Sequence, residues 1–131
     1  QLLVNWLREN QLGIRLVLSK SDAKQHTLRH FVWDEHTTLQ TNQWGITEPN
    51  GGLEVEEKEL DMILVPLLAY DLQGNRVGYG KGFYDRFLAN CNANVQKVGL
   101  SYFEPLDSIG DAESFDIKLN SCINPEKIWR F

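Results

Sequence analysis

The sequence has little cysteine and methionine and no long hydrophobic run. It contains two cysteines and one methionine, and the cysteines, Cys91 and Cys122, form no CxxC pair. Their spacing gives no sign of a disulfide framework, and a reducing, cytoplasmic compartment is therefore expected. The longest apolar stretch, Met62 to Tyr70, has the size of a strand and contains Pro66. It is much shorter than the ~18 residues that a membrane-spanning helix needs.

Basic residues are also in the minority. The chain carries 13 Lys and Arg against 18 Asp and Glu, a net charge of -5 with a pI near 5.1. General nucleic-acid binders depend on neutralising phosphates, so this balance argues against that class and against a membrane partner. A small anionic ligand needs only a local positive site and stays possible.

The length of 131 residues predicts one domain spanning residues 1–131. Hydrophobic residues make up 42% and charged residues 24%, which are ordinary values for a globular chain and argue against disorder or a coiled coil. The chain begins with Gln1 rather than Met and is expected to be a fragment of a longer protein. No signal peptide is visible at this start.

The pattern of apolar residues predicts strands that alternate with short helices, which is typical of a layered α/β domain. The segment from Asp61 to Tyr70 is expected to be a central strand, since both of its faces are apolar. The polar stretch 19–24 is interpreted as a loop, 34–43 as irregular or one helical turn, and the acidic stretch 54–59 as a solvated loop or an exposed helix edge. The predicted helices are 2–10 and 82–90, and the predicted strands are 14–18, 28–33, 61–70, 95–103, 116–123 and 127–129.

The segment after the predicted central strand carries the chemistry. A turn at Gly74-Asn75 leads into Gly78, Gly80 and Gly82, and a helix follows. Alternate glycines let the backbone approach a ligand closely, and a helix N-terminus favours an anion. Lys81 and Arg76 supply positive charge for phosphate, and Asp85 can hold Mg2+ beside it.

Standard nucleotide motifs do not account for this segment. It contains neither GxxxxGK[ST] nor GxGxxG, because the spacing is GxGxG. A glycine-rich hairpin with a structural lysine is the alternative that the spacing alone leaves open. The lysine and the aspartate that flank the glycines favour a nucleotide-phosphate site.

The same residues carry a resemblance to a known family. The blocks 65–71 (VPLLAYD) and 74–88 (GNRVGYGKGFYDRFL) resemble the signature of 5-formyltetrahydrofolate cyclo-ligase, also called 5,10-methenyltetrahydrofolate synthetase. The segment 44–49 (WGITEP) resembles the family's GI-x-EP, and 115–119 (FDIKL) its HD-x-x-L. Two departures are Leu67 in place of a common glycine and Phe115 in place of the usual histidine. The family's N-terminal segment, with a Lys/Arg-bearing helix and a folate-contacting Glu, is not found in this sequence.

The resemblance implies an ATP-dependent ligase of one-carbon metabolism. Such an enzyme converts 5-formyltetrahydrofolate, in some cases polyglutamylated, to 5,10-methenyltetrahydrofolate with release of ADP and phosphate. It also implies a three-layer α/β/α fold with a mixed, largely parallel sheet, similar to sugar-phosphate isomerases and CoA-transferases. A cytoplasmic monomer or weak homo-oligomer is expected, with a small-molecule substrate and neither nucleic-acid nor membrane partners.

Site residues follow from the resemblance position by position. Lys81 and Arg76 would be catalytic, and Asp85 and Asp116 would hold Mg2+. Trp44 would lie near the pterin or formyl group. ATP would be bound by Arg76, Val77, Gly78, Tyr79, Gly80, Lys81, Gly82, Phe83 and Tyr84, and the folate by Trp44, Tyr79, Gly80, Lys81, Gly82 and Phe83.

Structural roles are the alternatives for several of these residues. Trp44, Phe83 and Tyr84 can be core aromatics, and Asp116 can cap a turn. Arg86, Cys91 and the three histidines are interpreted as structural, packing and surface residues. The alternative functions are a sugar-phosphate isomerase or CoA-transferase-like enzyme, and a non-catalytic nucleotide- or folate-binding remnant.

Overall fold

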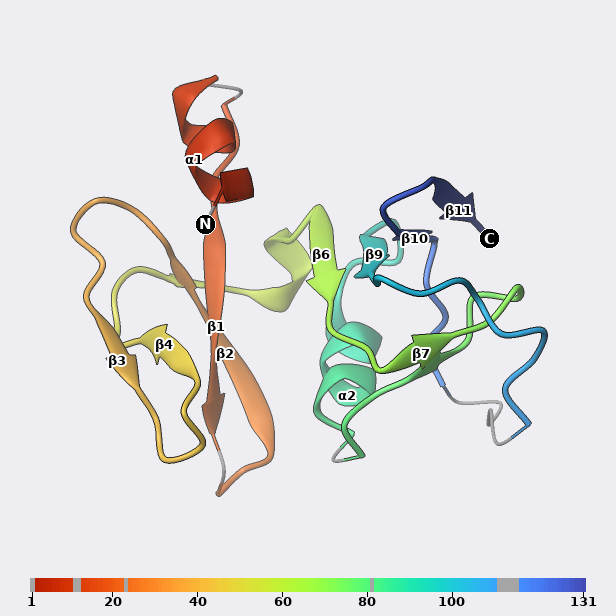
Figure 1. Cartoon of the computed structure of the whole chain (residues 1–131). Helices are drawn as coiled ribbons and strands as arrows, with labels where there is room; N and C mark the ends of the chain where they lie inside the picture. The colour runs from red at the N-terminus through yellow and green to blue at the C-terminus, as the bar shows by residue number, and fades with distance from the viewer. Residues whose placement is uncertain (1, 11–12, 23, 81, 111–115) are drawn as a thin grey trace. The chain divides into compact units, whose positions relative to one another are not determined.

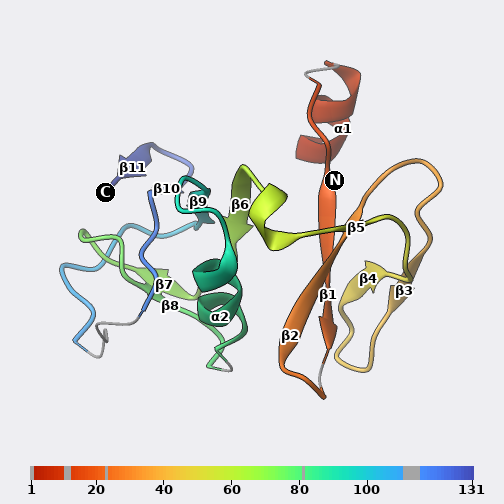
Figure 2. The same ribbon diagram turned by 180° about the vertical axis from the view of Figure 1, so that it is seen from behind.

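The chain forms two compact units in a computed structural model that describes residues 2–10, 13–22, 24–80, 82–110 and 116–131 (Figures 1 and 2). Unit 1 comprises residues 1–21 and 29–55, and unit 2 comprises 22–28 and 56–131. That the two units belong to one domain over 1–131 stays a prediction.

Unit 1 is built from one helix and two small sheets. The helix α1 (Leu2–Glu9) matches the predicted helix 2–10. A three-stranded sheet has the order β1-β2-β5, with β5 antiparallel to β2, and β3 pairs with β4 in an antiparallel hairpin. These strands are β1 (Val17–Asp22), β2 (Thr27–Val32), β3 (Leu39–Thr41), β4 (Thr47–Pro49) and β5 (Glu54–Val55).

Two polar segments of unit 1 that were not predicted as strands contain strands. β1 begins at Val17 and runs through the polar residues to Asp22, so the predicted strand 14–18 lies too early in the sequence. Its polar side chains have partners: Ser19 Oγ lies 3.0 Å from His30 Nδ1, and Ser21 donates to Glu48 from its backbone N–H and its hydroxyl. A strand whose polar side chains are hydrogen-bonded can belong to a sheet even when its sequence has no apolar pattern. β3 is exposed along its whole length, which explains why hydrophobic periodicity missed it.

Unit 2 is organised around a four-stranded mixed sheet with the order β11-β10-β9-β6. β6 and β9 are parallel, β9 and β10 are parallel, and β11 is antiparallel to β10. This confirms the predicted α/β class with a mixed, largely parallel sheet. The strands are β6 (Met62–Val65), β9 (Gln96–Leu100), β10 (Ser121–Ile123) and β11 (Ile128–Arg130); a 3-10 helix, η1 (Glu57–Glu59), precedes β6.

The predicted strand 61–70 is two strands in the structure. β6 ends at Val65, and β7 (Ala69–Tyr70) forms a separate antiparallel hairpin with β8 (Arg76–Val77). Pro66 follows Val65 directly, and its missing N–H cannot extend a ladder of hydrogen bonds. Within the described sheet β6 is the edge strand, with Met62 and Leu64 exposed, so the expectation of a central strand was wrong.

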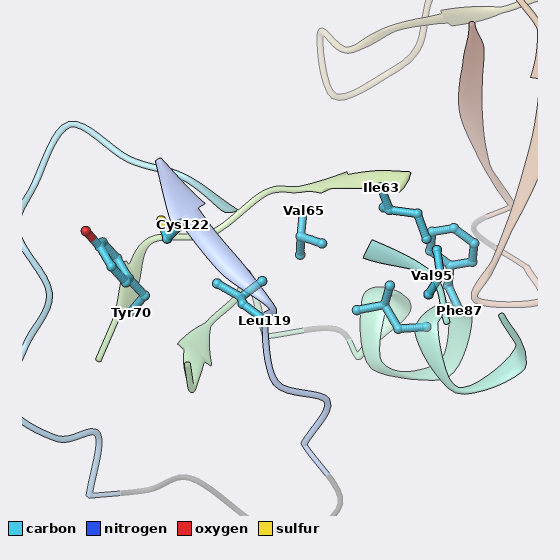
Figure 3. Packing of buried hydrophobic residues seen from close by; sticks show 8 residues of the cluster. Ile63, Val65, Tyr70, Phe87, Val95, Leu119 and Cys122 are labelled. Carbon is cyan, nitrogen blue, oxygen red and sulfur yellow. The ribbon is translucent and has the colours of Figure 1, made fainter. Parts of the chain in front are cut away.

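The core of unit 2 lies between this sheet and the helix α2 (Phe83–Asn90), which matches the predicted helix 82–90. Phe87 and Leu88 are its buried residues, and Phe87 points toward the strands (Figure 3). Parallel strands need a crossover connection, and the chain from β6 to β9 supplies it through α2. The buried cluster contains Ile63, Val65, Tyr70, Phe87, Leu88, Val95, Leu119 and Cys122.

The other face of the sheet carries exposed apolar side chains. Leu100 and Ile123 are neighbours in the ladder, and both are exposed, as are Met62, Leu64 and Ile128. The second helical layer of the predicted α/β/α arrangement therefore stays a prediction. No helix in the described residues is long and apolar enough to cross a bilayer.

Candidate functional site

The glycine segment, residues 78–82, lies between β8 and the first turn of α2. The N–H of Leu68 donates to the carbonyl of Val77 at 2.8 Å. Because Leu68 comes three residues after the end of β6, this bond brings the start of the segment beyond the carboxyl end of that strand. Open α/β sheets place ligands beyond this end of their strands. The glycine segment therefore starts near the carboxyl end of β6, although a hairpin intervenes in the chain.

An ion pair closes the base of the segment. Arg76 Nη2 on β8 lies 2.7 Å from Asp85 Oδ1 on α2. The side chain of Arg76 is 5% exposed and that of Asp85 is 33% exposed. The N–H of Ile117 also donates to Asp85 Oδ1, at 3.4 Å. The Arg76 guanidinium and the N–H of Ile117, which lies 32 residues after Asp85, thus meet at one carboxylate oxygen.

Gly78 leaves room for this arginine. A Cβ atom built at Gly78 would lie 3.0 Å from Arg76 Nη1, which is tighter than ordinary packing allows. A side chain at this position would push against the guanidinium. The absence of a side chain at Gly78 therefore leaves room for the ion pair, in addition to any ligand that the segment binds.

The other two glycines adopt backbone conformations that favour glycine. Gly80 has φ +84°, and a Cβ there would meet no described atom within 4 Å, so the space beside it is open. Gly82 is the N-cap of α2 with φ +64° and ψ 12°. It has no side chain to supply the capping hydrogen bond that Ser or Asp gives, which leaves the first N–H groups of α2 for another acceptor.

The aromatic residues of the segment differ in their environment. Tyr79 is 68% exposed beside Gly80. The ring of Phe83 meets that of His26 at a tilt of 45°, with ring centroids 5.7 Å apart. Tyr84 packs against the core and meets Phe87 edge to face, and burial raises its pKa while the charge of Arg76 opposes the rise. Tyr84 thus packs as a core aromatic, and its predicted part in ATP binding stays a prediction, while Tyr79 is exposed.

Both predicted magnesium ligands lie at this end of the unit. Asp116 immediately precedes Ile117, whose N–H contacts Asp85, so the two acidic residues are brought together through the backbone. Asp85 Oδ2 accepts no hydrogen bond from a described residue. Among the residues that the structure describes, no group of three or more His, Cys, Asp or Glu side chains could hold a metal. Mg2+ is commonly held by one or two carboxylates together with substrate phosphates, and a pair of aspartates fits that mode.

The roles of two predicted site residues stay predictions. Lys81, predicted as the principal cation, lies outside the described residues, as does Phe115. Trp44 belongs to unit 1, where its side chain is 46% exposed. Its predicted contact with the substrate stays a prediction.

Arg86, Cys91 and His30 have clear environments in the structure. Arg86 donates from Nε and Nη2 to the carbonyl of His26, so its structural interpretation is confirmed. Cys91 is a free cysteine whose pKa is raised to about 11 by burial, as expected for a packing residue. His30 is buried beside Ser19, and its interpretation as a surface or loop residue was wrong.

Sequence reasoning missed the contact of the segment 22–28 with α2. His26 has φ +53°, binds Arg86 through its carbonyl and meets the ring of Phe83. It lies 57 residues before Phe83, and no periodicity or motif links the two. This connection therefore had no detectable signal in a single sequence.

Comparison with known proteins decides the family. The sequence model of the 5-formyltetrahydrofolate cyclo-ligase family matches residues 7–108. The chain belongs to this family. The match begins in α1 and includes the complete glycine segment and α2, so the cyclo-ligase resemblance is confirmed over most of the chain.

Named cyclo-ligases are similar at the level of sequence. A probable 5-formyltetrahydrofolate cyclo-ligase of Schizosaccharomyces pombe is 32% identical over 113 residues, which cover 76% of this chain and 55% of the relative. The 5-formyltetrahydrofolate cyclo-ligase of Escherichia coli K12 is 36% identical over 98 residues, covering 71% of this chain and 53% of the relative. The chain therefore spans about half the length of these relatives.

Solved structures show the same fold. The NMR structure of the Aquifex aeolicus 5,10-methenyltetrahydrofolate synthetase matches with a TM-score of 0.75 and 30% identity, over 98% of this chain and 64% of that one. The synthetase of Mycoplasma pneumoniae matches with a TM-score of 0.71 and 25% identity, over 96% and 64%. These likenesses give no support to the isomerase or CoA-transferase alternative.

Proposed function

We propose that this cyclo-ligase family member takes part in the ATP-dependent cyclisation of 5-formyltetrahydrofolate to 5,10-methenyltetrahydrofolate, with release of ADP and phosphate. The observation that carries the proposal is the family match across the glycine segment, where open backbone lies beside the Arg76–Asp85 ion pair. A small-molecule folate is the substrate, in monoglutamate or polyglutamylated form. We place the activity in the cytoplasm, where two free cysteines stay reduced.

The chemistry requires activation of a poor leaving group. The formyl oxygen attacks the γ-phosphate of ATP, its new P–O bond forms as the bond to ADP breaks, and an imidate phosphate results. N10 of the folate then attacks the formyl carbon, and the C–O bond breaks with release of phosphate. The protein's task is to position the reactants and to stabilise the charge that develops on the transferring group.

The glycine segment supplies the groups for this task. The backbone N–H groups from Gly78 to Tyr84 would hold the ATP phosphates, with Lys81 as the principal cation. Arg76 and Val77, which precede this segment on β8, would also contact ATP. Tyr79, Gly80, Lys81, Gly82 and Phe83 would also border the folate, and Trp44 is a further residue that we expect to bind it.

Asp85 and Asp116 would bind Mg2+, which neutralises phosphate charge when it is bound. The fit rests on the carboxylate of Asp85, which is one-third exposed and keeps one oxygen without a hydrogen bond from described residues. The residues themselves bind and orient the nucleotide. Removal of either carboxylate should weaken the binding of ATP with Mg2+ more than that of ATP alone.

A turnover assay tests the proposal. The purified chain is mixed with 5-formyltetrahydrofolate, ATP and Mg2+, and the methenyl product is followed by its absorbance. Lys81→Ala should lower turnover by about 100-fold or more, as the loss of one donor to a developing charge commonly does. The matched control is Lys58→Ala, which removes an exposed lysine from η1.

Each outcome separates the candidates. Turnover that Lys81→Ala removes and Lys58→Ala retains supports the proposal. Equal turnover in Lys81→Ala and the wild type contradicts the assignment of Lys81. Binding of ATP and folate by calorimetry without turnover would support the alternative of a binding remnant.

A further inference from the structure

Arg76 is buried in a way that does not suit a direct phosphate ligand. Its side chain is 5% exposed, Nη2 is bonded to Asp85, and a Cβ built at Gly78 would lie 3.0 Å from Nη1. Nε is also buried and has no hydrogen-bond partner among the described residues. A ligand would have to displace protein atoms to reach this guanidinium. A buried arginine also needs its counter-charge, because an uncompensated charge in the interior is costly.

Asp85 uses its two oxygens differently. Oδ1 accepts from both Arg76 Nη2, at 2.7 Å, and the N–H of Ile117, at 3.4 Å. Oδ2 accepts no hydrogen bond from a described residue, and the side chain is 33% exposed. Two donors on one oxygen fix the plane of the carboxylate. The second oxygen is then presented from the first turn of α2.

We infer that Arg76 is a positioning residue that acts on the nucleotide through Asp85, and that Asp85 Oδ2 is the atom offered to the cation. The inference rests on the proposed function and changes the role of one residue within it. Carboxylates that bind metals are commonly oriented by such outer partners. Gly78 belongs to the same arrangement, since a side chain there would displace the guanidinium.

The coupling between the two residues can be measured without any ligand. Urea unfolding is recorded for the wild type, Arg76→Gln, Asp85→Asn and the double variant. The effects of the single substitutions should be non-additive, because each removes the same ion pair. Asp85→Asn leaves a buried guanidinium without its counter-charge and can prevent folding. If Asp85→Asn does not fold while the double variant does, the recovery of folding on removal of Arg76 shows the coupling. Strictly additive effects overturn the inference.

The role in binding is tested by titrating ATP calorimetrically into the wild type and Arg76→Gln, once with EDTA and once with Mg2+. Arg76→Gln should leave the affinity for ATP in EDTA unchanged. Mg2+ should raise the ATP affinity of Arg76→Gln less than it raises that of the wild type. Where Mg2+ raises the wild-type affinity by about 10-fold or more, the increase in the variant should be smaller by about 10-fold or more. The control Arg86→Gln removes an arginine of α2 that binds the carbonyl of His26, and should leave the Mg2+ gain unchanged.

The outcomes distinguish this inference from the proposed function. An equal loss of affinity with EDTA and with Mg2+ identifies Arg76 as a direct phosphate ligand, and overturns the positioning role while ATP binding stands. A wild-type chain that binds ATP under neither condition contradicts the proposed function itself, and the positioning role with it.

Discussion

Asn75 binds the carboxylate of Asp71 twice. Its backbone N–H donates to Oδ1 at 2.9 Å, and its side-chain amide donates to Oδ2 at 2.8 Å. The N–H groups of Gln73 and Ile109 also donate to this carboxylate, at 2.9 and 3.0 Å. Asp71 is fully buried. Asn75 is followed directly by Arg76, which belongs to the candidate site. The carboxylate therefore fixes the turn from which the candidate site begins.

Asp71→Ala should reduce the free energy of unfolding by about 3 kcal/mol or more, because several buried donors lose a charged acceptor. Urea denaturation measures the change. Asp107→Ala is the matched control, since Asp107 is exposed in a nearby segment and should change stability by less than about 0.5 kcal/mol. Equal midpoints for the two variants would contradict the structural role of Asp71.

Glu48 should make unit 1 sensitive to acid. Burial raises its pKa, but hydrogen bonds from Ser21 and Asn42 outweigh burial and lower the pKa below its usual value of 4.5. A group with a depressed pKa stabilises the fold above its unfolded pKa, and this contribution is lost as the pH falls through the folded pKa. Stability should therefore decrease from about pH 4.5 downward.

Glu48→Gln should cost about 1–2 kcal/mol at pH 7, since bonds to a charged acceptor are replaced by bonds to a neutral one. The difference from the wild type should shrink between pH 4.5 and pH 2, as measured by urea unfolding at several pH values. Glu9→Gln, at an exposed position of α1, should keep the wild-type pH dependence. A constant difference across this range would contradict the assignment.

The glycines of the segment should respond differently to substitution. Gly80→Ala meets open space and should cost only the backbone strain of a positive φ, about 1–2 kcal/mol. Gly78→Ala should instead disturb the Arg76–Asp85 pair through its contact with Nη1. Calorimetry should show that Gly78→Ala reduces the Mg2+ gain in ATP affinity, as Arg76→Gln does. An unchanged Mg2+ gain in Gly78→Ala would speak against the packing argument.

Both thiols should be slow to react in the folded chain. Burial raises the pKa of Cys91 to about 11, and Cys122 is completely buried, so the thiolate fraction and access are both low at pH 8. A colorimetric disulfide reagent should report two thiols in denaturant and little fast reaction in the native chain. One thiol that reacts rapidly in the native chain would contradict the packing of these residues.

Local signals in the sequence were sufficient to predict the helix and several of the strands of unit 2. The helix α2 follows Gly82 at its N-cap, and its apolar positions lie on one face, so both its start and its packing were predictable. Arg76 and Asp85 were predicted as site residues because a long motif contains both. Their contact with each other was not predicted, since nothing in the motif indicates that β8 and α2 are joined by an ion pair.

The remaining errors have one physical cause. Hydrophobic patterns cannot reveal polar strands whose side chains are satisfied by distant residues. β1 is stabilised in this way by His30 and Glu48, which lie 11 and 27 residues after their partners. The break of the long apolar strand at Pro66 was visible in the sequence, and the chemistry of proline should have outweighed the hydrophobicity of the segment.

The most direct test of the account is to map the amide signals of the 15N-labelled chain as ATP with Mg2+ is added. The account predicts that the largest shifts occur at the backbone N–H groups of Gly78, Tyr79, Gly80, Gly82 and Phe83. Saturating nucleotide that leaves these signals in place, or that shifts mainly the β3–β4 hairpin, would contradict it.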